Sequence, residues 1–180
     1  MLKWLKKSGV KMALVIGSLG TLVLLVTAGV AIEKTNSLEF CVSCHSMEQT
    51  VYQEYKKSLH YKNEYGVRVE CPDCHVPEVY PDKLFAKIIA VKDVWHEILG
   101  TIDTKEKFEK HRLRMAERVW AKMEATESRE CRTCHAFDAM NLEDMGRRAQ
   151  RKHPQAQQEG KHCIQCHKGV VHELPANYEG

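Results

Sequence analysis

The sequence predicts a mainly α-helical protein in which one N-terminal transmembrane helix is followed by a small, irregular helical domain. Three observations support this fold class. Residues 12–32 carry no charged side chain, and the apolar residues beyond them recur at helical rather than alternating spacing. All eight cysteines of the 180-residue chain fall in four copies of Cys-x-x-Cys-His.

The uncharged segment 12–32 has the length of a single membrane span. As a helix it would measure about 31 Å, close to the ~30 Å hydrocarbon core of a bilayer. The preceding residues 1–11 contain no acidic side chain and four lysines, Lys3, Lys6, Lys7 and Lys11. Because cationic segments stay on the cytoplasmic side, we expect a cytoplasmic tail at residues 1–11 and place residues 33–180 in the periplasm, outside a bacterial inner membrane.

A cleaved secretory signal is the alternative interpretation of this segment. Thr27, Ala28, Gly29 and Ala31 are small enough to resemble a cleavage region. The apolar run is longer than the ~7–15 residues of a typical signal and continues without a polar break. Its length therefore favours an uncleaved anchor in the lipid bilayer.

The cysteine motifs predict the cofactor. Cys-x-x-Cys-His is the attachment site of a c-type haem, in which the cysteines form two thioethers and the histidine is an axial iron ligand. Zinc sites and redox dithiols also use Cys-x-x-Cys, but neither requires a histidine directly after the second cysteine. We therefore expect four covalently bound haem c groups, at Cys41/Cys44/His45, Cys71/Cys74/His75, Cys131/Cys134/His135 and Cys163/Cys166/His167.

The haems are expected to form the core of the exported domain. Residues 33–180 are too few to enclose four haems and also to build a large aliphatic core. The motifs begin at residues 41, 71, 131 and 163, which groups them as two pairs. This spacing predicts two dihaem halves, about 33–100 and 101–180, within one tetrahaem domain.

Three longer helices are predicted in this domain. Residues 82–99 are amphipathic and end before Gly100. A second helix is predicted to begin at Asp103 or Thr104, with Glu106 placed for a capping box. A third helix is predicted to end or kink at Pro154. The apolar side of the first is marked by Leu84, Phe85, Ile88, Ile89, Trp95 and Leu99.

The charge of the chain disfavours a nucleic-acid partner. The formal net charge of +3 includes +4 from the four tail lysines, so residues 12–180 sum to −1. Haem propionates would add further negative charge. We therefore expect no nucleic-acid partner.

Histidines outside the motifs are candidates for the second axial position of each iron. A low-spin, electron-carrying haem needs two strong axial ligands, so several of these histidines are expected to bind iron. His172 stands out because it follows His167 by only five residues. The six candidates are His60, His96, His111, His153, His162 and His172.

Four stretches resemble the NapC/NirT family of membrane-anchored tetrahaem cytochromes, namely CPDCHVP, GTIDTKEKFEKHRLRMAERVW, ECRTCHAFDAM and CIQCHKGVVHELP. The similarity extends from the anchor to Pro175 and is greatest to the members that feed periplasmic nitrate reductase. It implies a quinol dehydrogenase of anaerobic respiration. Such a protein oxidises a membrane quinol, menaquinol or ubiquinol, and relays electrons to a periplasmic reductase or its cytochrome subunit.

The resemblance also implies a ligand set. His60, His153 and His172 match the distal ligands of three low-spin haems. Met47 matches a position at which one relative uses methionine as the axial ligand of the first haem, whereas other relatives retain the motif histidine, here His45. An apolar side chain that only packs beside the porphyrin is the alternative role for Met47.

Two residues of the predicted helix 82–99 match the family's quinol site. Asp93 matches a carboxylate at the open side of the first haem, where it would accept a proton from quinol. Lys87 matches a lysine beside the same pocket. Solvated surface residues are the alternative for both, since an Asp and a Lys in such a helix usually face water.

Two other functions are compatible with four haem motifs. One is an electron hub that serves several periplasmic reductases. The other is a terminal reductase of nitrite or a similar small oxidant, which usually marks its catalytic haem by a departure from the motif, and here all four motifs are regular. The activity expected is therefore quinol dehydrogenation and not terminal reduction. A homo-oligomer is compatible with the sequence.

Overall fold

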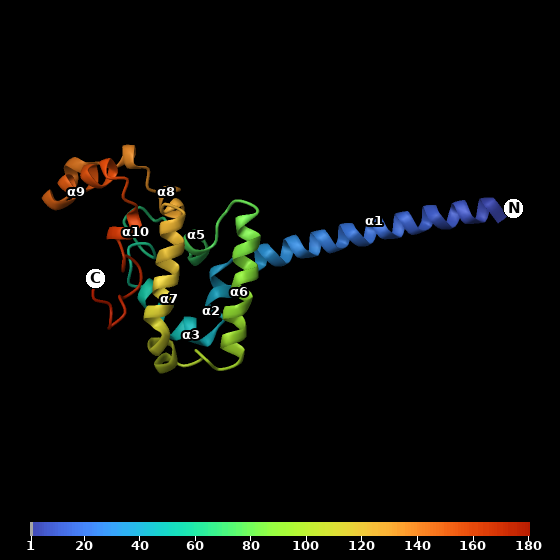
Figure 1. Ribbon diagram of the computed structural model, residues 1–180, viewed down its shortest axis with the longest axis horizontal. Coiled ribbons are helices and arrows are strands. Elements are labelled where there is room, and N and C mark those ends of the chain that lie inside the picture. The colour runs from blue at the N-terminus through green and yellow to red at the C-terminus, as the bar shows by residue number, and fades with distance from the viewer. Residues whose placement is uncertain (1) are drawn as a thin grey trace.

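The computed structural model describes the backbone of residues 2–180 and the side chains from residue 9 onward, so Met1 and the side chains of most of the basic tail lie outside the described residues. Figure 1 shows one long helix that stands away from a small helical domain. No strand occurs in residues 2–180, which confirms the mainly helical fold class. The helices are α1 (Leu2–Lys34), α2 (Leu38–Val42), α3 (His45–Gln49), α4 (Val51–Tyr55), α5 (Cys71–His75), α6 (Asp82–Ile98), α7 (Lys105–Ala125), α8 (Arg129–Arg132), α9 (Arg147–Gln158) and α10 (Cys163–Cys166), with 3-10 turns η1 (Phe137–Ala139) and η2 (Leu142–Asp144).

α1 is one unbroken helix that is longer than the predicted anchor. It spans Leu2–Lys34, whereas the uncharged segment covers residues 12–32. Within the part from Gly9 to Lys34, the most apolar 18-residue window has a mean hydropathy of 2.3 and is not buried against the rest of the protein. By length and composition, α1 is the helix of the described chain that can cross a membrane.

The prediction of a helix over residues 82–99 is confirmed. α6 spans Asp82–Ile98 and is followed by Gly100, whose φ of +67° suits a residue without a Cβ. Figure 1 shows that α6 and α7 flank the short helices α2, α3 and α5. These two longest helices of the domain therefore enclose the first two haem motifs.

The start of α7 differs in one detail from the prediction. Its N-cap is Thr104, whose hydroxyl accepts a hydrogen bond from the backbone N–H of Lys107 at 3.3 Å. Because Thr104 and not Asp103 is the cap, the third helical residue is Lys107, and the capping box predicted with Glu106 is wrong. Glu106 instead lies in the first turn, where a carboxylate interacts favourably with the helix dipole.

α9 does not end at Pro154, so the first of the two predicted outcomes, an end or a kink at this proline, is wrong, and the kink stays a prediction. The helix runs through the proline to Gln158. A proline inside a helix removes one i to i−4 hydrogen bond, and the turn beyond it is closed by the Glu159 N–H, which donates to the Gln155 carbonyl at 3.0 Å. The helix therefore tolerates the loss of a single hydrogen bond.

The domain buries very little apolar surface of its own. Among the side chains that the structure describes, the buried apolar ones are Leu38, Tyr55, Phe108 and Ile164, together with Pro72, Pro77 and Pro175. Seven such side chains are far fewer than a domain of this size needs for an aliphatic core. The covalent haems are therefore the main apolar material available to fill its interior.

A buried ion pair joins three parts of the domain. The guanidinium of Arg112 on α7 pairs with the carboxylate of Glu54 on α4, and both side chains are about nine-tenths buried. Arg112 also donates to the Glu173 carbonyl at 3.0 Å, and the Glu173 N–H donates to Glu54 at 3.0 Å. The pair therefore fixes α4 and the C-terminal segment against α7.

Replacing Arg112 with alanine is expected to lower the free energy of unfolding by about 3–5 kcal/mol, because Glu54 is then left buried without a counter-charge. Denaturant unfolding of the purified holoprotein, followed by far-UV circular dichroism, measures the change. Arg118→Ala, at an exposed position of the same helix, is the matched control and should change stability by no more than about 0.5 kcal/mol. Equal losses in the two variants would contradict the account.

Candidate haem and quinol site

The first haem motif lies between the short helices α2 and α3 and the polar side of α6. Cys41 belongs to α2, and His45 is the first residue of α3. The next residue, Ser46, donates through its backbone N–H and its hydroxyl to the two carboxylate oxygens of Glu97 on α6, at 3.2 and 2.6 Å. These two hydrogen bonds fix Ser46, and with it the adjacent motif histidine His45, to α6.

α6 is also tied to the C-terminal end of α1. The Lys83 ammonium lies 2.8 Å from the carboxylate of Glu33, and the Lys87 ammonium donates to the Thr35 carbonyl at 2.7 Å. Burial lowers the pKa of Lys87. The first motif therefore lies at the end of the domain from which the apolar helix leaves (Figure 1).

The other motifs follow one another away from α1. α2, which contains Cys41, packs against α5, which begins at Cys71, so the first two motifs are neighbours. α5 packs against α8, which contains the first cysteine of the third motif. Figure 1 shows α10, with the fourth motif, on the side of α7 opposite to α6.

The third motif is held differently from the second. α5 contains all of the second motif, Cys71–His75, whereas α8 ends at Arg132, so Cys134 lies in the turn beyond it. The Cys134 N–H donates to the Cys131 carbonyl at 3.2 Å. The side chains of Cys134 and Cys166 are exposed, whereas those of the other six cysteines are half-buried.

Haem attachment at Cys134 and at the other seven cysteines stays a prediction, because a porphyrin joined to them by thioethers would itself cover these side chains.

Ser128 connects the third motif to the fourth. It has a φ of +54°, is fully buried, and directly precedes α8. Its hydroxyl accepts a hydrogen bond from the Ile164 N–H, inside the fourth motif, at 3.1 Å. A left-handed conformation costs about 1 kcal/mol or more for a residue with a Cβ, so this strained turn is held by its surroundings.

Three histidine pairs define the geometry of the site. Each pair joins a motif histidine to a histidine outside the motifs. Two of the three pairs cross between residues 33–100 and 101–180, so the two predicted halves are interlocked. The ring centroids are 6.1 Å apart in His60–His135, 6.2 Å in His75–His172 and 5.9 Å in His153–His167.

These separations suit a metal ion between two imidazoles. A metal–imidazole bond is ~2.0–2.1 Å long and the ring centroid lies about 1 Å behind the nitrogen, so two axial imidazoles have centroids roughly 6 Å apart. Desolvation by the surrounding chain and the nearby His172 lower the pKa of His75. Burial also lowers the pKa of His60. Both rings are therefore neutral at pH 7, the form that binds a metal ion.

The fourth motif borders an open cavity of about 860 Å³. A cavity of 300–1,000 Å³ is typical of cofactor sites. The Nδ1 atom of His153 is buried and has no hydrogen-bond partner among the described residues. The basic lining suits the carboxylates of a haem. The lining includes His153, Cys166 and His167 together with Arg147, Arg148, Lys152 and Lys161.

The first motif differs from the other three, because His45 belongs to none of the histidine pairs among residues 2–180. His45 is exposed, and Met47 on the same helix is half-buried. Asp93 is exposed on α6 one turn before Glu97, so it lies on the helix side that faces the first motif. Whether Met47 or His45 is the axial ligand stays a prediction, as does the role of Asp93.

The remaining histidines outside the motifs lie elsewhere. His96 sits 3.4 Å from the Thr101 hydroxyl, and His162 caps α10. His111 lies half-buried on α7. None of the three belongs to a histidine pair among the described residues, which agrees with the absence of a family ligand position for them.

Two acidic residues of the site were not predicted from the sequence. Glu97 binds Ser46, and Glu54 lies 3.7 Å from the Nδ1 atom of His172. Burial opposes ionisation of Glu54, but His172 and Arg112 outweigh it and lower the pKa of this carboxyl. A carboxylate behind a metal-binding imidazole orients the ring. No local pattern marks either residue, because each acts on a segment far away in the chain.

The four motifs, the thin apolar core and the paired imidazoles define a multihaem c-type cytochrome with one membrane anchor. A model of the NapC/NirT cytochrome c family, N-terminal region, matches residues 3–177, and the chain belongs to this family. The cofactors predicted from the motifs, four haem c groups, are those of its tetrahaem members.

Three relatives illustrate the similarity. A protein of Allochromatium vinosum described as a tetraheme cytochrome-c type is 55% identical over 80% of this chain and 78% of its own length. The denitrification system component NirT of Stutzerimonas stutzeri is 50% identical over 81% of this chain and 72% of its own. The cytochrome c-type protein NapC of Escherichia coli is 47% identical over 90% of this chain and 81% of its own length. No solved structure matches the chain.

The His153→Ala variant is expected to convert one low-spin haem into a high-spin haem while all four haems stay attached, because one iron loses its second strong axial ligand. EPR spectra and a pyridine haemochrome assay measure spin state and haem content. His111→Ala is the control, since His111 belongs to no histidine pair, and it should leave both unchanged. A wild-type low-spin count in His153→Ala would contradict the pairing.

Proposed function

We propose that this chain oxidises a membrane quinol near its first haem motif and delivers the electrons to a periplasmic reductase from its fourth. One observation supports this direction above all others. The first motif is fixed to α6, which is itself tied to the end of α1, and it is the motif whose histidine has no partner imidazole among the described residues. The chain therefore offers one open position on its membrane side.

The paired histidines would hold the iron of the other three haems. By their separations, His60 would serve the third motif, His172 the second and His153 the fourth. Each haem, when bound, supplies a one-electron couple between ferric and ferrous iron. Two strong axial imidazoles also exclude small oxidants from these irons, which favours a relay over a terminal reductase.

Asp93 and Lys87 would act on the quinol. Oxidation of a quinol releases two protons with its two electrons, so a carboxylate near the hydroxyl group is a suitable proton acceptor. Asp93 is exposed on the side of α6 that faces the first motif, and it has room to receive a ligand. Lys87 lies one and a half turns earlier, where its ammonium already binds the Thr35 carbonyl and could position a quinol oxygen at the same edge.

The lysine-rich start of α1 supports an orientation with the N-terminus in the cytoplasm and the domain in the periplasm. The reductase partner would then meet the far end of the domain, near α9. Resemblance to the members that feed nitrate reductase favours that enzyme or its cytochrome subunit as the partner. The relative NirT is named for denitrification, so relatives of this chain serve more than one process. Nitrate reductase as the partner is therefore the most specific claim of this proposal.

Replacing Asp93 with asparagine is expected to lower the rate of quinol-driven haem reduction at least about 100-fold, because general bases contribute about 10²–10⁴-fold to proton-transfer steps. The measurement uses the holoprotein in liposomes with menaquinol and ubiquinol analogues. Haem content and reduction by dithionite should not change.

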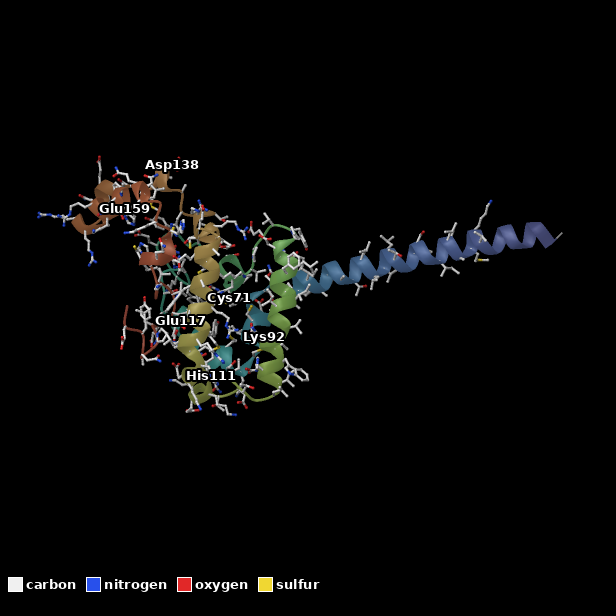
Figure 2. All side chains as sticks on the ribbon, in the orientation of Figure 1. Cys71, Lys92, His111, Glu117, Asp138 and Glu159 are labelled. Carbon is white, nitrogen blue, oxygen red and sulfur yellow. The ribbon has the colours of Figure 1, made fainter. Side chains whose placement is uncertain are left out.

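Asp138→Asn is the matched control for this variant, since Asp138 lies at the opposite end of the domain (Figure 2). Unchanged quinol turnover in Asp93→Asn would remove Asp93 from the mechanism. If the wild-type protein itself is reduced by dithionite but by neither quinol analogue, the proposed activity is wrong.

The surface of α9 is expected to dock an acidic partner. Arg147, Arg148, Arg151 and Lys152 are exposed on this helix beside the fourth motif. Reversing one charge outside the cavity lining, in Arg151→Glu, should slow electron delivery to the purified reductase several-fold at low salt and weaken its salt dependence. Stopped-flow oxidation of the reduced cytochrome tests this, with Arg118→Glu on α7 as the control. Equal slowing in both variants would contradict docking at α9.

A further inference from the structure

α6 is amphipathic in the opposite sense to a helix of a water-soluble domain, because its polar side faces the protein. That side makes the polar contacts described above, an ion pair through Lys83 and hydrogen bonds through Lys87 and Glu97. The apolar side faces away. Its residues Leu84, Ile88, Val91, Trp95 and Ile98 follow one another at helical spacing and are 42–71% exposed.

The haems do not cover this apolar side. The first motif lies on the other side of the helix, since Ser46, next to the motif histidine, binds Glu97 on the polar side. The second motif, in α5, lies between α6 and α7, and the third and fourth motifs lie further from α6 (Figure 1). An exposed apolar strip along four turns of one helix marks an interaction surface.

The position of α6 indicates what this surface meets. The helix lies across the end of α1, to which Lys83 and Lys87 bind it, and it forms the side of the domain from which α1 leaves (Figure 1). Figure 2 shows carbon-rich side chains that project from α6 toward that side. When α1 spans a bilayer, the apolar side of α6 therefore faces the same bilayer.

We propose that α6 lies in the surface of the membrane that α1 crosses, with its apolar side among the lipid acyl chains and headgroups. A helix with one apolar and one polar side, parallel to the membrane plane, is the usual form of an interfacial anchor. Trp95 and Phe85 are of the residue types that favour this depth. The two helices together fix the orientation of the domain instead of leaving it on a single tether.

The bilayer fits this surface better than an anionic partner does. The charges of α6 balance, because Lys83, Lys87 and Lys92 are matched by Asp82, Asp93 and Glu97. The attachment is therefore apolar in origin, and it should persist at high salt. The apolar side of α6 also lies next to the apolar surface of α1, at the end of α1 to which Lys83 and Lys87 bind.

The test uses the reactivity of one introduced thiol. Haem attachment consumes all eight native cysteines, so a Val91→Cys variant of the full-length holoprotein has a single free thiol. Val67→Cys is the matched control, because Val91 and Val67 are similarly exposed, at 66% and 61%, and Val67 lies in a loop away from α6. Both variants are reconstituted in liposomes of phosphatidylethanolamine and phosphatidylglycerol at several thousand lipids per chain and treated with a water-soluble maleimide.

We expect the thiol at position 91 to react at least about tenfold more slowly than the thiol at position 67, with the same ratio at 0.5 M salt. Equal rates would overturn the proposal. Protection that disappears when the protein is diluted in lipid would also overturn it, because it would identify a second copy of the chain as the covering partner. If Val91→Cys reduces the haem content, Ile98→Cys provides the same test. Reduction by a quinol analogue is measured in the same liposomes, so failure of the quinol proposal is scored separately.

Discussion

Three pairs of imidazole rings, held about 6 Å apart, are the constraint on which the rest of the structure depends. Each pair brings together segments that no aliphatic core holds, since only seven apolar side chains, three of them prolines, are buried among those described. His60 and His172 each reach a motif in the other half of the domain. Iron between the rings would therefore act as a cross-link as well as a redox centre.

Local features of this fold were predictable from the sequence, and long-range ones were not. The motifs, the membrane helix and both ends of α6 depend on residues close together in the chain. The capping box at Glu106 failed because Asp103 and Thr104 are both good caps and only the folded backbone selects one. The assignment of each distal histidine required the fold, because sequence spacing does not fix which motif a distant ring meets.

Helical periodicity predicted only part of the arrangement of α6. It identified which residues share a side but not the direction in which that side points. The structure turns Glu97 toward the first motif and Trp95 toward the outside. We propose that one helix thereby serves two environments, with its polar side toward the first haem and a quinol and its apolar side toward the lipid.

EPR spectroscopy of the oxidised, membrane-purified protein tests the central claim most directly, because the angle between two axial imidazole planes sets the anisotropy of a low-spin ferric haem. The planes are 10° apart in His153–His167 and 74° apart in His60–His135. The account predicts three low-spin centres and a fourth centre of another kind. The haem between His153 and His167 should give a rhombic EPR signal, and the haem between His60 and His135 a highly anisotropic one. Four equivalent centres, or fewer than three low-spin ones, would contradict it.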